Sequence, residues 1–189
     1  DTAKGLYRLY LALTAAEAVL LRIGGMNWYD AFIHTFGTVG TGGFSNYNTS
    51  VAHFTSPYIQ IVIIVFMVLA GMNFNLYYVG IIQKHGLKSI FRDDETKFYL
   101  TVMGIAAAAI FLYNTIADGF RDVGGTLLSA AFQVTSINTT TGFATDDFEL
   151  WPTFSKMVLF AMFFFGGCSG STGGGIKCVR ILVCMKLLR

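Results

Sequence analysis

The chain has 189 residues, of which 54% are hydrophobic and only 13% are charged. A soluble globular domain typically carries about 25% charged residues, whereas the apolar residues here form long uncharged blocks. This composition excludes an ordinary soluble domain and predicts an all-α protein that lies in a lipid bilayer. The formal net charge of +2 distinguishes no class of partner, but the positions of the charges are informative.

Four apolar segments are long enough to cross a bilayer, which takes roughly 20 residues of helix. They cover residues 9–24, 58–82, 98–117 and 157–176. The first contains Glu17, a charge that we expect to face the protein interior rather than lipid. The last is interrupted by glycines, and the other two contain no charged residue.

Most of the 13 basic residues gather at three places: the N-terminus, the loop after the second segment, and the C-terminus. They are Lys4, Arg8, Lys84, Lys88, Arg92, Lys97, Lys177, Arg180, Lys186 and Arg189. Stretches 44–57 and 138–155 contain no Lys or Arg. Because cytoplasmic loops are enriched in Lys and Arg, both ends of this chain and the 83–97 loop are predicted to be cytoplasmic. The acidic run Asp93-Asp94-Glu95 in that loop is predicted to be a solvated surface or a contact for a regulatory subunit.

Two segments between the apolar blocks are too polar and glycine-rich to span a membrane. Residues 27–45 and 122–145 each begin with a short apolar stretch and end in Thr and Gly. Our alignment, which requires one inserted residue, pairs Ala31-Phe32 with Ala131-Phe132 and residues 41–45 with residues 140–144. The chain is therefore predicted to be an internal duplication of span, re-entrant segment and span, with repeats at residues 1–86 and 87–189. Since the chain begins at Asp1, we expect it to be part of a longer protein.

Re-entrant backbone inside a bilayer must be buried in protein or line a cavity that holds water or ions, because its polar groups cannot face lipid. Extended Thr- and Gly-rich backbone meets this condition in cation filters, where carbonyl oxygens replace the water around an ion. The negative, C-terminal end of a short helix favours a cation in the same cavity. Thr-Val-Gly at residues 38–40 matches the start of the potassium-channel filter sequence. Ordinary glycine-rich extracellular loops are the alternative, and the matching positions of the two copies disfavour it.

Three strings, TVGTGGFS, INTTTGFATDDFELWP and GGCSGSTGGGIKCVRILV, resemble the TrkH/KtrB superfamily of bacterial potassium uptake proteins. In that superfamily four repeats of span, pore helix, filter strand and span surround one pore, as in potassium channels. This chain resembles the second and third repeats, with Gly43 and Gly142 as the key glycines. The resemblance implies a filter whose backbone is formed by Thr41, Gly42, Gly43, Phe44, Asn138, Thr139, Thr140, Thr141, Gly142 and Phe143. It places K⁺ itself at Gly43, Thr140, Thr141 and Gly142.

The fourth apolar segment is rich in glycine. It contains Gly166, Gly167, Gly170, Gly173, Gly174 and Gly175. Because each glycine inside a helix costs about 1 kcal/mol relative to Ala, the helix is predicted to break here and to resume around residues 177–188. The resemblance implies that this break is a gating loop formed by Gly170, Ser171, Thr172, Gly173, Gly174 and Gly175. Close helix packing through small residues would explain two or three of these glycines, but not all of them.

An intramembrane serine protease is the alternative function, because Gly167-Cys168-Ser169-Gly170 resembles the G-x-S-G motif of rhomboids. Such a serine needs a His base within hydrogen-bond reach. The histidines are His34, His53 and His85, and each is expected to lie away from Ser169.

Two other kinds of site are not supported by the residue spacing. A P-loop is excluded, because Ile176 separates Gly175 from Lys177 where the motif requires Gly-Lys. The odd number of cysteines, without C-x-x-C spacing, predicts buried thiols at Cys168, Cys178 and Cys184.

The resemblance implies selective K⁺ permeation across the bacterial inner membrane, with K⁺ as the transported substrate, and a protein that is not an enzyme. It also implies the partners: the remaining repeats of the same chain, a second copy in a homodimer, and a cytosolic RCK-type subunit that binds nucleotide. No nucleotide site in this chain and no nucleic-acid partner are expected. Selectivity against Na⁺, and whether the protein is a symporter coupled to Na⁺ or H⁺, stay open.

Overall fold

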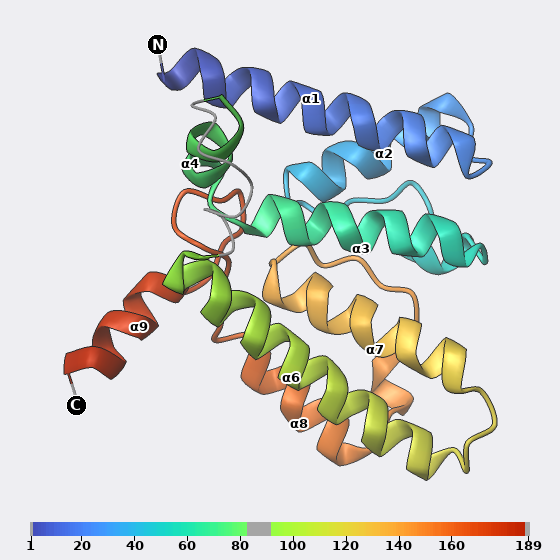
Figure 1. The fold of residues 1–189 in the computed structure, drawn as a ribbon. Coiled ribbons are helices and arrows are strands. Elements are labelled where there is room, and N and C mark those ends of the chain that lie inside the picture. The colour runs from blue at the N-terminus through green and yellow to red at the C-terminus, as the bar shows by residue number, and fades with distance from the viewer. Residues whose placement is uncertain (1, 83–91, 188–189) are drawn as a thin grey trace.

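The computed structural model describes residues 2–82 and 92–187. Within these residues all regular structure is helical, which confirms the predicted all-α fold. Two halves each contain one long helix, one shorter helix and a third helix (Figure 1). They are α1 (Thr2–Ile23), α2 (Trp28–Val39) and α3 (Pro57–Gly71), then α6 (Asp94–Ala117), α7 (Val123–Asn138) and α8 (Thr153–Met162). The halves meet where α3 lies beside α7 (Figure 1).

Short elements complete the chain. They are η1 (Ser50–His53), α4 (Phe74–Tyr77), the π-helical turn η2 (Tyr78–Ile82), η3 (Phe148–Leu150) and α9 (Cys178–Leu187). In Figure 1, α9 extends away from the rest of the molecule, on the same side as the N-terminus and α4. The predicted boundary between the repeats lies outside the described residues, as do Lys84, His85 and Lys88.

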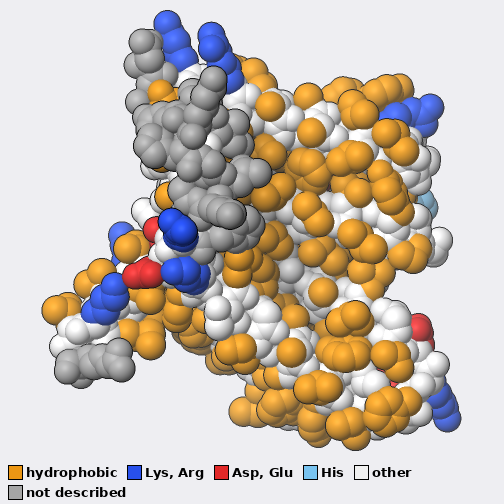
Figure 2. Space-filling model, viewed as in Figure 1, with side chains coloured by type: hydrophobic (Ala, Val, Ile, Leu, Met, Phe, Trp, Pro, Cys, Tyr) orange, Lys and Arg blue, Asp and Glu red, His pale blue; other side chains and the backbone are white. Residues whose placement is uncertain are grey.

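The long helix α6 shows why these segments become helices. Its N-terminus is capped by Asp93, whose Oδ2 accepts a hydrogen bond from the Thr96 amide at 2.8 Å, and further acidic residues follow in the first turn. Beyond Lys97, α6 carries no charged residue and is mostly apolar. Hydrophobic side chains cover the middle of the face seen in Figure 2, whereas Lys and Arg lie toward its ends. This distribution is typical of a membrane protein whose middle part is surrounded by lipid.

Of the four predicted spans, one forms a single apolar helix of spanning length in the described residues. By length and composition, α6 alone among the described helices could cross a membrane, and α3 together with Phe74–Gly80 passes only as a pair bent by 93°. α1 contains Arg8, Glu17 and Arg22, which lower its hydropathy, and α8 ends after 10 residues. The spans of this chain are therefore irregular, and their interruptions lie close to the glycine-rich stretch.

The bend between α3 and α4 has a local cause and a long-range consequence. Asn73 begins the new helix, because its Oδ1 accepts from the Asn75 amide at 2.9 Å. The bend frees two carbonyls at the end of α3 for other donors. The Ala70 carbonyl accepts from the Thr172 amide at 3.3 Å, and the Gly71 carbonyl accepts from the Cys168 amide at 2.8 Å.

The hydrophobic core consists of two clusters that interlock the halves. One lies among α1, α2 and α3 but includes Phe132 and Phe143 from the second half. The other lies among α6, α7 and α8 but includes Phe74 and Tyr77 from the first half. Because each cluster contains residues of both repeats, the halves pack as one unit.

Candidate functional site

The chain that follows α2 folds back onto the end of that helix. We call residues 40–45 the first loop. Its amides at Thr41, Gly42 and Gly43 donate to the carbonyls of Thr38, Gly37 and Gly37, at 3.0, 2.8 and 3.1 Å. Thr41 and Gly43 have positive φ values of 49° and 63°, a conformation that is costly for a residue with a Cβ and recurs at functional sites.

The chain that follows α7 repeats this geometry. We call residues 139–144 the second loop. Its amides at Thr140, Thr141 and Gly142 donate to the carbonyls of Ile137, Ser136 and Ser136, at 3.0, 2.9 and 3.3 Å. Thr140 and Gly142 have positive φ values of 59° and 88°. The two loops therefore share one backbone design.

This hydrogen bonding fixes where the carbonyls of both loops point. In a trans peptide the carbonyl points opposite to the N–H of the same unit. Since the amides of residues 41–43 face α2 and those of residues 140–142 face α7, the carbonyls of residues 40–42 and 139–141 point away from the helices. Such oxygens can surround a cation that has lost its water, and the C-terminal ends of α2 and α7 favour positive charge there.

The structure corrects the alignment of the two repeats. Gly37 matches Ser136 and Thr41 matches Thr140 by their hydrogen bonds, and the same spacing needs no inserted residue. The predicted pairing of Phe32 with Phe132 is wrong, because Phe32 is 44% exposed whereas Phe132 is fully buried. Shared residue identity had moved this part of the alignment out of register by one position.

Thr38, which begins the Thr-Val-Gly match, and Asn138, which the resemblance places in the filter backbone, both belong to helices. Thr38 lies in the last turn of α2, where its hydroxyl donates to the His34 carbonyl at 2.7 Å; the Thr-Val-Gly match at residues 38–40 is therefore mostly helical. Asn138 is the last residue of α7 and is buried. The other predicted residues, 41–44 and 139–143, all lie in the first and second loops.

The two loops contact each other directly. A Cβ added to Gly43 would lie 2.0 Å from the Thr141 carbonyl oxygen, so only glycine fits at this contact. Beside it, the Phe143 ring is buried and stacks on His34 with 5.7 Å between ring centroids. A Cβ added to Gly37 would lie 2.8 Å from Cζ of Phe143, so this ring fills the space that Gly37 leaves open.

The predicted glycine-rich break is present. α8 ends at Met162 and α9 begins at Cys178, and we call residues 166–177 between them the Gly-rich loop. It bonds to both other loops: the Thr41 hydroxyl donates to the Thr172 carbonyl at 2.9 Å, and the Gly174 amide donates to the Thr140 hydroxyl at 2.6 Å. The Gly-rich loop also donates to the carbonyls freed by the bend after α3. All three loops therefore meet at one place.

Hydrogen bonds close the Gly-rich loop near its two ends. The Gly166 amide donates to the Ile176 carbonyl at 2.9 Å, and the Cys178 amide donates to the Gly167 carbonyl at 3.2 Å. Glu95 at the start of α6 accepts from this region as well. The prediction that the acidic run is a solvated surface is therefore wrong for Glu95, which is 8% exposed.

A family model described as TrkH, cation transport protein, matches residues 6–189. The chain belongs to the TrkH family. Its relatives include the Trk system potassium uptake protein TrkH of Escherichia coli (strain K12), which is 37% identical over 190 residues. TrkG of the same organism is 36% identical over 187 residues, and TrkI of Halomonas elongata is 31% identical over 188 residues. The alignments cover 98%, 98% and 99% of this chain, and 38%, 38% and 37% of the respective relatives.

The fold agrees with the sequence match. The crystal structure of the potassium transporter TrkH from Vibrio parahaemolyticus superimposes with a TM-score of 0.93 at 35% identity, covering 97% of this chain and 40% of that one. This confirms the resemblance to the TrkH/KtrB superfamily of membrane transporters. TrkH proteins transport cations and are not enzymes. This chain spans well under half the length of these relatives.

A carboxylate at the start of α2, which the sequence analysis did not single out, holds the end of the first loop of this TrkH-family chain. Asp30 is buried, and its side chain accepts hydrogen bonds from Asn27, Asn46 and Tyr47, each at 2.8 Å. Asn27 caps α2 by accepting from the Asp30 amide, and this spacing was a usable signal for the start of a helix. Nothing in the local sequence shows that residues 46–47 return to the Asp30 side chain.

One buried polar side chain on each of α2 and α7 reaches the end of the adjacent loop or the residues just after it. His34 Nε2 lies 3.0 Å from the Ser45 hydroxyl, and Gln133 Nε2 donates to the Asp146 carbonyl at 3.0 Å. The two residues occupy matching positions of α2 and α7, so they mark the repeat as clearly as the glycines do. The chemical difference between His and Gln hid this match in the sequence.

The rhomboid-like alternative is not favoured by the surroundings of Ser169. The Ser169 amide bonds to Glu95. His34 contacts Asp30 and Ser45, and His53 stacks on Tyr47 with 3.7 Å between ring centroids. Neither contacts Ser169, and His85 lies outside the described residues.

The thiols and Glu17 are placed partly as expected. Cys168 and Cys178 are buried, but Cys184 on α9 is exposed, so the prediction of a buried thiol is wrong there. Glu17 is fully buried, which confirms that it faces protein. Among the described residues neither of its carboxyl oxygens has a hydrogen-bond partner.

Proposed function

We propose that this chain supplies the second and third repeats of a TrkH-family potassium uptake protein. In this proposal K⁺ passes the first and second loops and is held there by backbone oxygens of residues 41–44 and 139–143, with K⁺ closest to Gly43, Thr140, Thr141 and Gly142. One observation carries it: two loops of the same design meet at Gly43 and Thr141, and their carbonyls point away from the helices.

The Gly-rich loop is proposed as the gate, through residues 170–175. Its hydrogen bonds to Thr41 and Thr140 support this role, because they place it against both loops at once. Glycine-rich backbone can adopt a second arrangement at low conformational cost, so the loop can leave the path without disrupting a helix. Permeation then needs only local movement.

The remaining repeats of the pore are proposed to come from the same parent chain, because this chain spans 38% of the TrkH relatives. We further propose a homodimer of parent chains in the bacterial inner membrane. The side that carries the N-terminus and α9 would face the cytoplasm and a nucleotide-binding RCK-type subunit. Basic residues at both ends of the chain and the exposed helix α9 support this orientation, and the relatives are named as parts of a Trk system.

Rubidium-86 uptake by the complete parent protein in proteoliposomes tests the function, with K⁺ and Na⁺ as competitors. The key variant is Gly142→Ser, and the matched control is Gly104→Ser on α6, where a Cβ meets nothing within 4 Å. We expect K⁺ to compete far better than Na⁺, and Gly142→Ser alone to reduce this preference by about tenfold, the effect of roughly 1.4 kcal/mol.

The outcomes separate the parts of the proposal. Equal competition by K⁺ and Na⁺ would retain a cation path but remove its potassium specificity. Unchanged preference in Gly142→Ser would remove the second loop from the filter. No uptake by parent protein that is folded and supplied with its cytosolic partner would contradict the proposed function.

A further inference from the structure

A single carboxylate oxygen holds the Gly-rich loop at both ends. Glu95 lies in the first turn of α6, and its Oε1 accepts from the Ser169 amide at 2.6 Å and from the Val179 amide at 3.1 Å. Ser169 is near the start of the Gly-rich loop, and Val179 is in the first turn of α9, just past its end. Glu95 therefore holds both ends of the segment 170–178, which contains the proposed gate residues 170–175.

The surroundings of Glu95 favour a strong interaction. Hydrogen bonds to an ionised acceptor are stronger than neutral ones, and Glu95 is mostly shielded from water. The carboxylate also lies at the N-terminal ends of both α6 and α9, where helix dipoles favour negative charge. Both donors are backbone amides, so side-chain variation at residues 169 and 179 leaves the contact in place.

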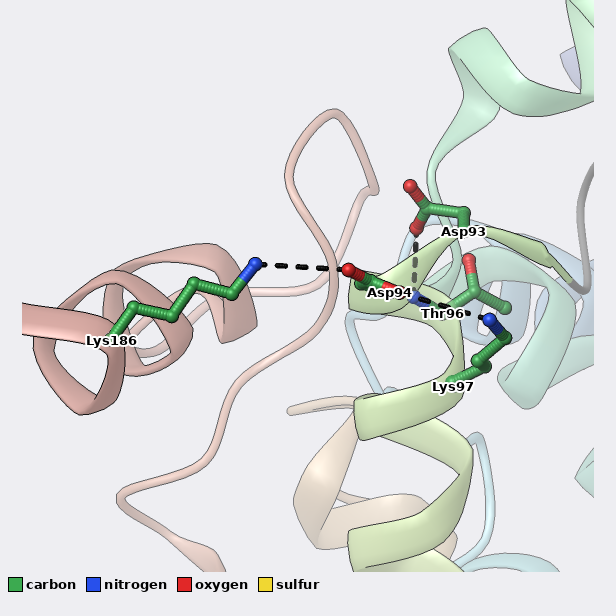
Figure 3. A network of polar contacts seen from close by, with 5 residues as sticks. All are labelled: Asp93, Asp94, Thr96, Lys97 and Lys186. Atoms are coloured by element: carbon green, nitrogen blue, oxygen red, sulfur yellow. Dashed lines mark hydrogen bonds and ion pairs between the residues drawn. The ribbon is translucent and has the colours of Figure 1, made fainter. Parts of the chain in front are cut away.

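The other links between α9 and the rest of the molecule are few. Within α9 only Cys178 is buried. Lys186 pairs with Asp94 at 3.7 Å (Figure 3), but both side chains are exposed, and exposed ion pairs contribute little. Asp94 also pairs with Lys97 at 3.7 Å. α9 is also joined to the start of the Gly-rich loop, because the Cys178 amide donates to the Gly167 carbonyl at 3.2 Å and the Cys178 thiol to the Gly166 carbonyl at 3.1 Å. Since α9 extends away from the body (Figure 1), a force applied to it acts on the contacts of Cys178 and Glu95.

We propose that Glu95 is a positioning residue that keeps the Gly-rich loop docked on the first and second loops, and that displacement of α9 releases it. This inference rests on the proposed function, because it assigns the regulation of the same loop. When α9 moves away from α6, the Val179 amide leaves the carboxylate. The α9 end of the loop is then held by one bond fewer, Glu95 holds only the Ser169 amide, and the contacts at Thr41 and Thr140 can break.

The acidic run supplies matched controls, because its three members make different contacts. Glu95 binds the Gly-rich loop, Asp94 reaches Lys186 and Lys97, and Asp93 only caps α6 through the Thr96 amide (Figure 3). Asp93→Ala therefore weakens the same helix end without touching the loop. Glu95→Gln keeps an oxygen acceptor but removes the charge.

The first measurement is rubidium-86 uptake by the complete parent protein in proteoliposomes without any cytosolic partner. Glu95→Ala is expected to raise this basal uptake about tenfold, and Glu95→Gln about threefold, because a charge-assisted bond is lost or weakened. Asp93→Ala is expected to match the wild type. Basal uptake in folded Glu95→Ala at or below the wild-type level would overturn the proposal, and Glu95→Gln decides in the same way where Glu95→Ala does not fold.

The second measurement follows the loop without relying on transport. Cys168 and Cys178 are buried beside the two ends of the Gly-rich loop, whereas Cys184 is exposed and serves as an internal reference. The labelling of each cysteine by a maleimide is quantified by mass spectrometry of peptides. In Glu95→Ala the labelling rate of Cys178 relative to Cys184 is expected to rise about tenfold, and in Asp93→Ala it is expected to stay unchanged.

Together the two measurements separate the proposals. Labelling that rises in Glu95→Ala although no variant takes up rubidium would support the role of Glu95 and contradict ion permeation. Wild-type uptake with unchanged labelling in Glu95→Ala would overturn the role of Glu95 and leave the proposed function in place.

Discussion

The first loop contacts the second, yet the two contribute different surfaces to that contact. The second loop gives its aromatic residue, Phe143, which lies buried against α2, while the matching Phe44 of the first loop is 80% exposed. The first loop gives its glycine, Gly43, which lies against the Thr141 carbonyl, while no described atom lies within 4 Å of a Cβ built on Gly142.

Such a contact is head-to-tail, because the first loop presents its glycine face and the second loop presents its aromatic face. Contacts of this kind continue until a ring closes. In the second repeat, a cavity of about 280 Å³ lies beside Gln133, Ser136 and Gly142. Its position matches the site on the first repeat where Phe143 packs against Gly37. The comparison teaches that the unused faces, Phe44 on one side and this cavity on the other, are expected contacts for the remaining repeats of the parent protein.

The largest effect is expected from Gly43→Ala. A Cβ there would overlap a backbone carbonyl at 2.0 Å, and φ is positive, so neither a side-chain shift nor a rotamer change relieves the clash. We expect the parent protein to show no measurable rubidium uptake and a lowered melting temperature. Gly104→Ala on α6, with open space around its Cβ, is the control and is expected to resemble the wild type.

Gly142→Ala extends this test to the comparison of the two loops. If the next repeat lies against Gly142 as the second loop lies against Gly43, we expect Gly142→Ala to reduce uptake and melting temperature of the parent protein as much as Gly43→Ala does. A Gly142→Ala protein as stable and active as Gly104→Ala would limit the head-to-tail contact to the one pair seen here.

Phe143→Ala is expected to be next in size. Removing a buried Phe costs about 3–5 kcal/mol, and this ring fills the space against Gly37 and His34. Thermal unfolding in detergent, with chemical denaturation for the free energy, measures the loss. Phe44→Ala is the matched variant: a comparable loss in the parent protein would show that another repeat covers Phe44, and no loss would break the head-to-tail rule.

Local chemistry made part of this structure predictable from the sequence. The Thr- and Gly-rich strings determine the conformation of both loops, and the glycines from Gly166 to Gly175 prevent α8 from continuing. Both effects depend on residues close in the chain, so they could be predicted. The duplication was visible for the same reason.

Long-range contacts explain what the sequence did not reveal. The carbonyls freed by the bend at residues 72–73 find their donors in the Gly-rich loop, which lies about 100 residues away in the chain. Glu95 looked like part of a charged surface because two acids precede it, and only its distant backbone donors show its role. The alignment of Phe32 with Phe132 failed because residue identity was weighed above burial.

A smaller effect is expected from exchanging the residues that support the two loops. Gly37→Ser would push a side chain into Phe143, whose Cζ is 2.8 Å from the added Cβ, and overpacking of this kind costs about 1–3 kcal/mol. At the matching place, Ser136 donates its hydroxyl to the Phe143 carbonyl at 2.6 Å. Ser136→Gly should cost about 1 kcal/mol through that bond. Thermal unfolding of both variants measures these losses, and a Gly37→Ser protein as stable as the wild type would contradict the tight contact of Phe143 with Gly37.

A further difference of similar size concerns the carboxylates near the ends of the two loops. Asp30 is buried and accepts from Asn27, Asn46 and Tyr47, so Asp30→Asn turns one acceptor into a donor that faces another donor. We expect a loss of about 2 kcal/mol. Asp146 is exposed and its side chain accepts from Trp151 at 3.0 Å, so Asp146→Asn should unfold like the wild type. Thermal unfolding of both variants in detergent measures this difference. If Asp146→Asn were the more damaging, the second loop would depend on a carboxylate as the first does, and this asymmetry between the repeats would be removed.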